Sequence, residues 1–162
     1  MSTSDLDLAG NAMGGVFPQW LTAFLNLAAD TPVAAGTDLQ ILDQDIGLLP
    51  RLPTGRAWLV VAFASATIQG TSAAPSASMV LNIRDGAGGT IVNRASNEYI
   101  GSGAGDTRCV SAFCVFPFSP GHDPHIEMRV KTGAGRTVTV FGPDGFYPGS
   151  FFTNIMAFAI PQ

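Results

Sequence analysis

Three segments of the chain are apolar at nearly every position, which is unusual for a β-strand at a protein surface. They cover residues 56–68, 109–118 and 151–160. Successive side chains of a strand point to opposite faces of its sheet, so a strand with one face in water shows a polar row of alternate residues. None of the three segments has such a row. This pattern predicts three strands that are covered on both faces.

The remaining segments between residues 37 and 141 alternate more regularly. Leu42 interrupts the alternation of the first of them, and Glu127, Arg129 and Lys131 form the polar face of a later one. Glycine-rich and proline-rich turns separate the segments. Eight or nine short strands with no helix between them are typical of an antiparallel β-sandwich, with a jelly roll as the leading topology. The shorter strands are expected at 38–45, 79–84, 90–94, 97–100, 126–131 and 137–141.

The first 36 residues show a different pattern and are expected to form an N-terminal arm, so that the sandwich domain spans residues 37–162. Residues 1–15 are small and polar. In residues 16–30, apolar side chains recur at helical spacing, which predicts a short amphipathic helix that Thr31 and Pro32 end. The stripe consists of Phe17, Trp20, Leu21, Phe24, Leu25, Leu27 and Ala28.

The three doubly apolar strands need a second cover. In a two-sheet sandwich, each sheet normally has one face in solvent. If these strands are neighbours in one sheet, copies of the chain around a threefold axis provide the simplest cover for its outer face. The composition favours the same conclusion, because 12% of the residues are charged, about half of the usual ~25%. A surface so poor in charge is suited to burial in an assembly.

Charge and apolar content exclude two classes of partner. The net charge is −4, and the 8 basic residues do not cluster, so we expect no nucleic-acid partner. No apolar stretch approaches the ~20 residues that span a bilayer, so we expect no membrane partner. Asp5 and Asp7 precede any apolar run and no Lys or Arg occurs before Arg51, so we expect no secretion leader. Cys109 and Cys114 are five residues apart. On one strand they point to opposite faces, and we expect free, mostly buried thiols.

Residues suited to catalysis are few. His122 and His125 flank Asp123 and Pro124. This cluster is either the beginning of a metal site or a solvated loop. We favour the solvated loop because no further metal ligand has a suitable spacing. Aromatic residues at Phe146 and Tyr147 suit either a protein interface or a stacked sugar, and we favour the interface. We therefore expect no enzyme activity, no metal and no cofactor.

The C-terminal part of the chain resembles known jelly-roll proteins. The resemblance lies in the segment Arg56 to Ile68, in the Met79 to Arg84 strand with its Asp-Gly turn, and in the ending GRTVTV…SFFTNIMAFAI. Over residues 37–160 the chain is similar to the trimeric modules of the tumour necrosis factor and complement globular-head type. It is also similar to small jelly-roll virion proteins of tailed phages, as capsid decoration or head-fibre components.

This resemblance implies a role and a set of contact residues. The last strand of such modules packs near the trimer axis, and the candidate trimer contacts are Phe151, Phe152, Asn154, Met156 and Trp58. We expect a non-enzymatic, homotrimeric capsid decoration (cement) protein that binds the major capsid protein or other virion subunits and assembles in the host cytoplasm. The alternative is a trimeric fibre or receptor-binding domain that recognises host carbohydrate. The candidate capsid contacts are Phe17, Trp20, Leu21 and Phe24.

Overall fold

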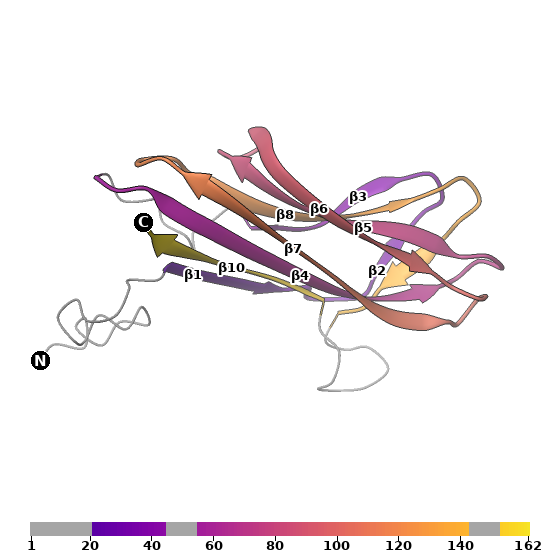
Figure 1. The fold of residues 1–162 in the computed structure, drawn as a ribbon. Helices are drawn as coiled ribbons and strands as arrows, with labels where there is room; N and C mark the ends of the chain where they lie inside the picture. Colours follow the sequence, from indigo (N-terminus) through magenta and orange to yellow (C-terminus); the bar gives the residue numbers. More distant parts are fainter. Residues whose placement is uncertain (1–20, 45–54, 143–152) are drawn as a thin grey trace, which may run out of the picture.

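The computed structural model describes residues 21–44, 55–142 and 153–162, and it contains strands but no helix in these ranges. The strands form two antiparallel sheets, stacked as two layers in Figure 1. The first, which we call the β4 sheet, contains β1 (Leu21–Asn26), β2 (Thr31–Val33), β4 (Trp58–Gly70), β7 (Thr107–Phe118), β9 (Val138–Val140) and β10 (Asn154–Pro161). The second, the β8 sheet, contains β3 (Asp38–Gln44), β5 (Ser76–Asp85), β6 (Thr90–Ile100) and β8 (Pro124–Thr132).

The strands pair in a nested order. β10 and β9 lie end to end along one edge of β4, and β7 pairs with the other edge. β1 and β2 continue the sheet beyond β10 and β9, while the β8 sheet has the order β3-β8-β5-β6. Early strands thus pair with late ones, and β5 pairs with β6 at the centre of the sequence. This nested pairing is the arrangement of a jelly roll, the topology that the sequence analysis expected.

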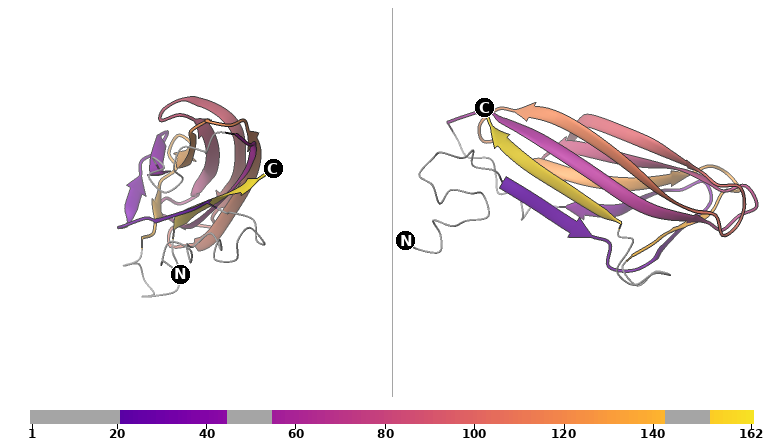
Figure 2. Two further views of the ribbon diagram at one scale, coloured as in Figure 1. Left: turned by 90° about the vertical axis from the view of Figure 1, so that its left-hand side faces the viewer. Right: turned by 60° about the horizontal axis from the view of Figure 1, so that its bottom comes forward.

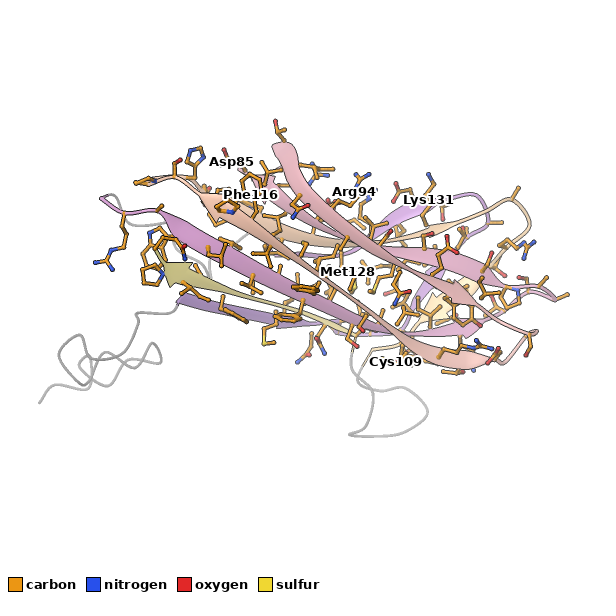
Figure 3. All side chains as sticks on the ribbon, viewed as in Figure 1. Asp85, Arg94, Cys109, Phe116, Met128 and Lys131 are labelled. Carbon is orange, nitrogen blue, oxygen red and sulfur yellow. The ribbon has the colours of Figure 1, made fainter. Side chains whose placement is uncertain are left out.

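The core lies between the two sheets. Trp58 and Tyr99 are the largest fully buried side chains, and Met79, Leu81 and Met128 are buried between the layers. Figure 3 shows Met128 between a layer that carries Arg94 and Lys131 and a layer that carries Cys109. These inward residues alternate along their strands, as the period of two requires. Burial of this apolar surface contributes about 25 cal/mol per Å² to folding.

Side chains of β6 close the free edge of β7. The amide nitrogen Nδ2 of Asn93 donates to the carbonyl of Val115 at 2.6 Å, and that of Asn97 donates to the carbonyl of Ser111 at 2.9 Å. The two layers curve toward each other when they are viewed end-on (Figure 2). An unpaired edge invites pairing with another chain. The asparagines use carbonyls of β7 that would otherwise be open to such pairing.

The prediction of an N-terminal helix is wrong for the residues of this segment that the structure describes. Leu21–Asn26 forms β1, which pairs with β10 in the register Leu21–Ala159 to Asn26–Asn154. The segment also alternates at strand spacing, and the open edge of β10 supplies backbone partners that a lone short helix does not have. The sandwich therefore includes residues that the sequence analysis assigned to the arm; Phe17 and Trp20 lie outside the described residues.

Two further details concern strand boundaries. Residues 90–94 and 97–100, expected as separate strands, belong to one strand, β6. The interruption of the alternation at Leu42 corresponds to a register shift between Gln40 and Leu42 in the pairing of β3 with β8. Ile41 and Leu42 are both buried, which a β-bulge permits because it turns two successive side chains to the same side.

Candidate interaction surface

The three doubly apolar strands are neighbours, in the order β10-β4-β7, which is the condition that the sequence analysis set for a second cover. Residues in register across a sheet share a face. Across β10, β4 and β7, three successive rows on the outer face contain only apolar side chains. We call these nine residues the apolar face: Met156, Phe63 and Phe113 in the first row, Phe158, Val61 and Val115 in the second, and Ile160, Leu59 and Pro117 in the third.

The first row holds the most exposed large apolar side chains of β4, β7 and β10. Phe113 is 58% exposed, Met156 39% and Phe63 36%. The ring of Phe63 stacks on that of Phe113, with centroids 5.6 Å apart, and on that of Phe158, with centroids 5.8 Å apart. A ladder of aromatic rings therefore crosses three strands. Offset stacks of this kind contribute about 0.5–1.5 kcal/mol each beyond the area they bury.

An uncharged polar band borders the apolar face. The next row along the strands consists of Asn154, Ser65 and Ser111, and Cys109 follows beside Thr67. The hydroxyl Oγ of Ser65 lies 3.2 Å from the thiol Sγ of Cys109. The apolar face and this band contain no Asp, Glu, Lys or Arg. A second surface can therefore approach this face without leaving a charge buried and unpaired.

The outer face of the β8 sheet has the opposite character. Arg129 donates through Nε to Asp38 at 2.7 Å and through Nη1 to Glu127 at 2.7 Å, and Arg94 donates to Asn82 at 2.9 Å. Arg84 also donates to Glu127, at 2.8 Å. Such paired charges are what a sheet face in water ordinarily carries. The two outer faces of the sandwich therefore differ: the outer face of the β4 sheet is apolar, and that of the β8 sheet is charged.

Glu127 corrects one expectation of the sequence analysis. The alternation along β8 predicted a solvent face of Glu127, Arg129 and Lys131; Lys131 is exposed, but Glu127 is only 2% exposed. Burial by itself raises the pKa of Glu127. Hydrogen bonds from Arg129, Arg84 and Asn82 outweigh that effect and hold the pKa below its ordinary value. The carboxylate therefore stays ionised at neutral pH under the side chains that cover it.

The candidate trimer contacts fall into three groups. Met156 lies on the apolar face, and Asn154 lies on the polar band beside it. Trp58 points into the protein's own core and is 1% exposed. Phe151 and Phe152 lie outside the described residues. Whether any of these residues contacts a partner stays a prediction.

The candidate capsid contacts and the aromatic loop are described only in part. Leu21 and Phe24 belong to β1, where they are in register with Ala159 and Met156. Phe17, Trp20, Phe146 and Tyr147 lie outside the described residues.

Sequence reasoning missed the residues that carry most of the apolar face. Phe63, Phe113 and Phe158 were each visible within an apolar strand. Each of these residues lies at an even spacing from other apolar residues of its strand. This spacing indicates that each belongs to an apolar face, and it was visible in the sequence. What the sequence lacked was the register between strands, which alone brings the three rings into stacks.

The two histidines each lie beside a carboxylate of the same chain. Nδ1 of His122 lies 2.7 Å from Oδ2 of Asp85, and Nε2 of His125 lies 3.3 Å from Oδ2 of Asp123. Among the described residues, no group of three or more His, Cys, Asp or Glu side chains is arranged to hold a metal ion. The expectation of no metal and no catalysis remains a prediction.

The two cysteines behave as their spacing predicted. Both are free thiols and they point to opposite faces. Cys114 is buried, but Cys109 is exposed on the outer face of the β4 sheet, so the expected burial is wrong for Cys109. Burial raises the pKa of the Cys114 thiol to about 11. A thiol that stays protonated is a poor nucleophile, so Cys114 acts as a small core residue.

The described part of the chain has no helix of the length and apolarity that a membrane span requires.

No family model matches the chain, and no curated protein matches it. Solved structures that match include Eiger TNF from S. frugiperda, at 10% identity and a TM-score of 0.45 over 88% of this chain and 92% of that one.

Two structures of infectious bursal disease virus also match. The Gx strain gives 13% identity and a TM-score of 0.46, and the T13 viral particle gives 9% identity and 0.46. Each covers 88% of this chain, which spans only 36% and 35% of those viral chains. All three TM-scores lie below 0.5.

Proposed function

We propose that this protein is a non-enzymatic structural subunit of a virion that assembles as a homotrimer and decorates the capsid. The observation that carries the proposal is the apolar face, whose nine residues include three large side chains that are 36–58% exposed. A contiguous apolar patch that a single subunit leaves in water marks a contact with another protein. The virion role rests on the resemblance of the sequence to phage jelly-roll proteins.

Further copies of this chain are the occupant that the chemistry of the face favours. The face carries no charge, so a like surface meets no repulsion and needs no complementary charge on a different partner. The stacked rings of Phe63, Phe113 and Phe158 offer steps into which side chains of another copy can fit. Aromatic anchors of this type dominate the energy of protein interfaces.

The expected energy of one contact is modest. Full burial of a Phe or Met side chain contributes about 1.5–3 kcal/mol, and the exposed residues of this face are already half-buried. Association costs at least ~4 kcal/mol. Only the whole face, repeated around a closed ring, outweighs that cost. Binding at many positions on a shell then makes weak single contacts collectively strong.

The first test is the mass of the purified protein in solution by light scattering. The proposal expects three times the chain mass of 16.8 kDa, about 50 kDa. A single species of 16.8 kDa at high concentration contradicts the homotrimer. A stable dimer supports the apolar face as a contact but contradicts the threefold arrangement.

The second test separates trimerisation from decoration. Deletion of residues 1–20, which contain the candidate capsid contacts Phe17 and Trp20, should leave the mass of the trimer unchanged. Sedimentation with purified shells that lack the protein should then show binding of the full chain and loss of binding by the truncated chain. A full-length trimer that does not sediment with shells contradicts the decoration role.

A further inference from the structure

A hollow of about 270 Å³ lies on the outer face of the β8 sheet. Its floor is β5, where Ser78 is in register with Glu98 of β6 on one side and with Lys131 of β8 on the other. Ser76 is in register with Ile100 in the same way. Small side chains on the central strand and long ones on both neighbours produce a trough along the strand.

The polar groups of this hollow are not used by the protein itself. Within the described residues, the side chains of Ser76, Ser78, Glu98 and Lys131 form no hydrogen bond or ion pair. Elsewhere on the same face, guanidinium groups and carboxylates bind each other, as in the pair of Arg129 with Asp38. The hollow therefore combines a concave shape with donors and acceptors that are open to a ligand.

Tyr99 and Thr132 alternate with the outward residues of β6 and β8, so their side chains point into the core and only their backbone borders the hollow. The hydroxyl of Tyr99 donates to the carbonyl of Asp106 at 2.6 Å, and the hydroxyl of Thr132 donates to the carbonyl of Ala34 at 2.5 Å. Both side chains are buried. These bonds anchor the strands beneath the hollow, and recognition of a ligand is left to the four open side chains on the outer face.

We propose that this hollow binds one neutral sugar residue. One carboxylate and one ammonium group give the site no net charge, which suits a neutral ligand. The carboxylate of Glu98 can accept from two neighbouring hydroxyls, and the ammonium group of Lys131 and the serine hydroxyls can donate to sugar oxygens. Ile100 is 61% exposed at the rim and offers an apolar surface to the C–H face of a sugar ring.

The site is independent of the proposed assembly. It lies on the outer face of the β8 sheet, whereas the apolar face lies on the opposite side of the sandwich, on the β4 sheet. Figure 3 shows Lys131 on the layer opposite to Cys109. A partner that covers the apolar face leaves the hollow open, so sugar binding and trimerisation can fail separately.

The test is an NMR titration of the ¹⁵N-labelled full chain with the methyl glycosides of glucose, galactose, mannose, fucose and N-acetylglucosamine. At least one glycoside should bind with a Kd of about a millimolar. The shifted amides should be confined to residues 76–78, 98–100 and 131–133. The absence of shifts with all five glycosides, or shifts confined to other residues, overturns the proposal.

Substitutions provide the matched control. Ser78→Val fills the floor of the hollow and removes a hydroxyl, and it should raise the Kd at least tenfold. Ser96→Val makes the same change at an exposed position of β6 on the same face, outside the hollow, and should leave the Kd unchanged. Glu98→Gln should weaken binding without changing the fold, since that side chain is exposed. Equal affinities of Ser78→Val and Ser96→Val overturn the assignment.

Discussion

The ring of Phe63 in β4 stacks on the ring of Phe113 in β7, with centroids 5.6 Å apart and planes inclined by 24°. The two residues are directly opposite each other across the pair of strands. Both belong to the outer face of the sheet, where a soluble sandwich ordinarily carries polar residues. The stack therefore leaves two large aromatic rings on a face that is ordinarily polar.

The first prediction concerns Phe113. Phe113→Ser removes the most exposed ring of the apolar face. It should weaken each contact between subunits about 5- to 150-fold, because it removes about 1–3 kcal/mol of burial and stacking. Light scattering should show a shift from trimer to monomer, while the melting temperature of the subunit changes little. Leu39→Ser, at a side chain of β3 that is 37% exposed and lies outside the face, is the control. Equal effects of the two variants would argue against this interface.

The second prediction concerns the pH dependence of stability. The pKa of Glu127 is lower in the folded protein than its ordinary value of 4.5. The ionised carboxylate therefore stabilises the fold above that value, and this stabilisation is lost as the pH falls through the lower, folded pKa. Melting curves below about pH 4.5 should show a steeper loss of stability for the natural chain than for Glu127→Gln.

Glu127→Gln should itself lower the free energy of unfolding by about 1–3 kcal/mol at neutral pH, because it removes the negative charge that Arg84 and Arg129 bind. Glu98→Gln is the matched control, since this carboxylate is exposed on the same face and has no ion pair among the described residues. It should leave both the stability and its pH dependence unchanged. Identical pH profiles of the natural chain and Glu127→Gln would contradict the ionic network.

The third prediction concerns the thiols. A maleimide should modify Cys109 in the native protein and leave Cys114 unmodified, because Cys109 is exposed while burial raises the pKa of Cys114 to about 11. Intact mass should show one added label in the native state and two after denaturation. Cys109→Ser should abolish native labelling, whereas Cys114→Ser should not. Rapid double labelling of the native chain would disprove this placement.

The fourth prediction concerns the loop beside Tyr99. A Cβ added at Gly101 would overlap the hydroxyl of Tyr99, which is buried and held by Asp106. Gly101→Ala should therefore destabilise the protein by about 1–3 kcal/mol, as overpacking does. Gly103→Ala, in the same loop, meets only a backbone oxygen at 3.9 Å and should be close to neutral in thermal unfolding. Similar melting temperatures of the two variants would contradict the packing described here.

Sequence reasoning placed the strands well where their alternation is strong. The inward residues Met79, Leu81 and Ile83 of β5 are fully buried, as expected. It failed at Leu21–Asn26, where apolar residues fit both a helical and an alternating pattern. Local periodicity does not decide between them, since the deciding contribution is the pairing of this segment with β10, whose partner residues lie 128–138 positions away in the chain.

The sequence predicted that an apolar outer surface exists, but it did not predict which residues lie side by side on that surface. Apolar residues on both faces of β4, β7 and β10 imply an outer face that lacks charge, and this follows from the residues alone. The register that stacks Phe63 on Phe113, the burial of Glu127 beneath three donors and the hollow around Ser78 depend on which strands are neighbours.

The amino-acid order by itself determined that the chain is a β-protein with more apolar strand surface than one sandwich interior holds. The period of two and the shortage of charge are local facts that need no partner strand. Only the tertiary structure decided where that surplus lies. Cross-strand neighbours are set by pairing between distant segments, and a shift of one residue in that pairing would exchange the inner and outer faces of a strand.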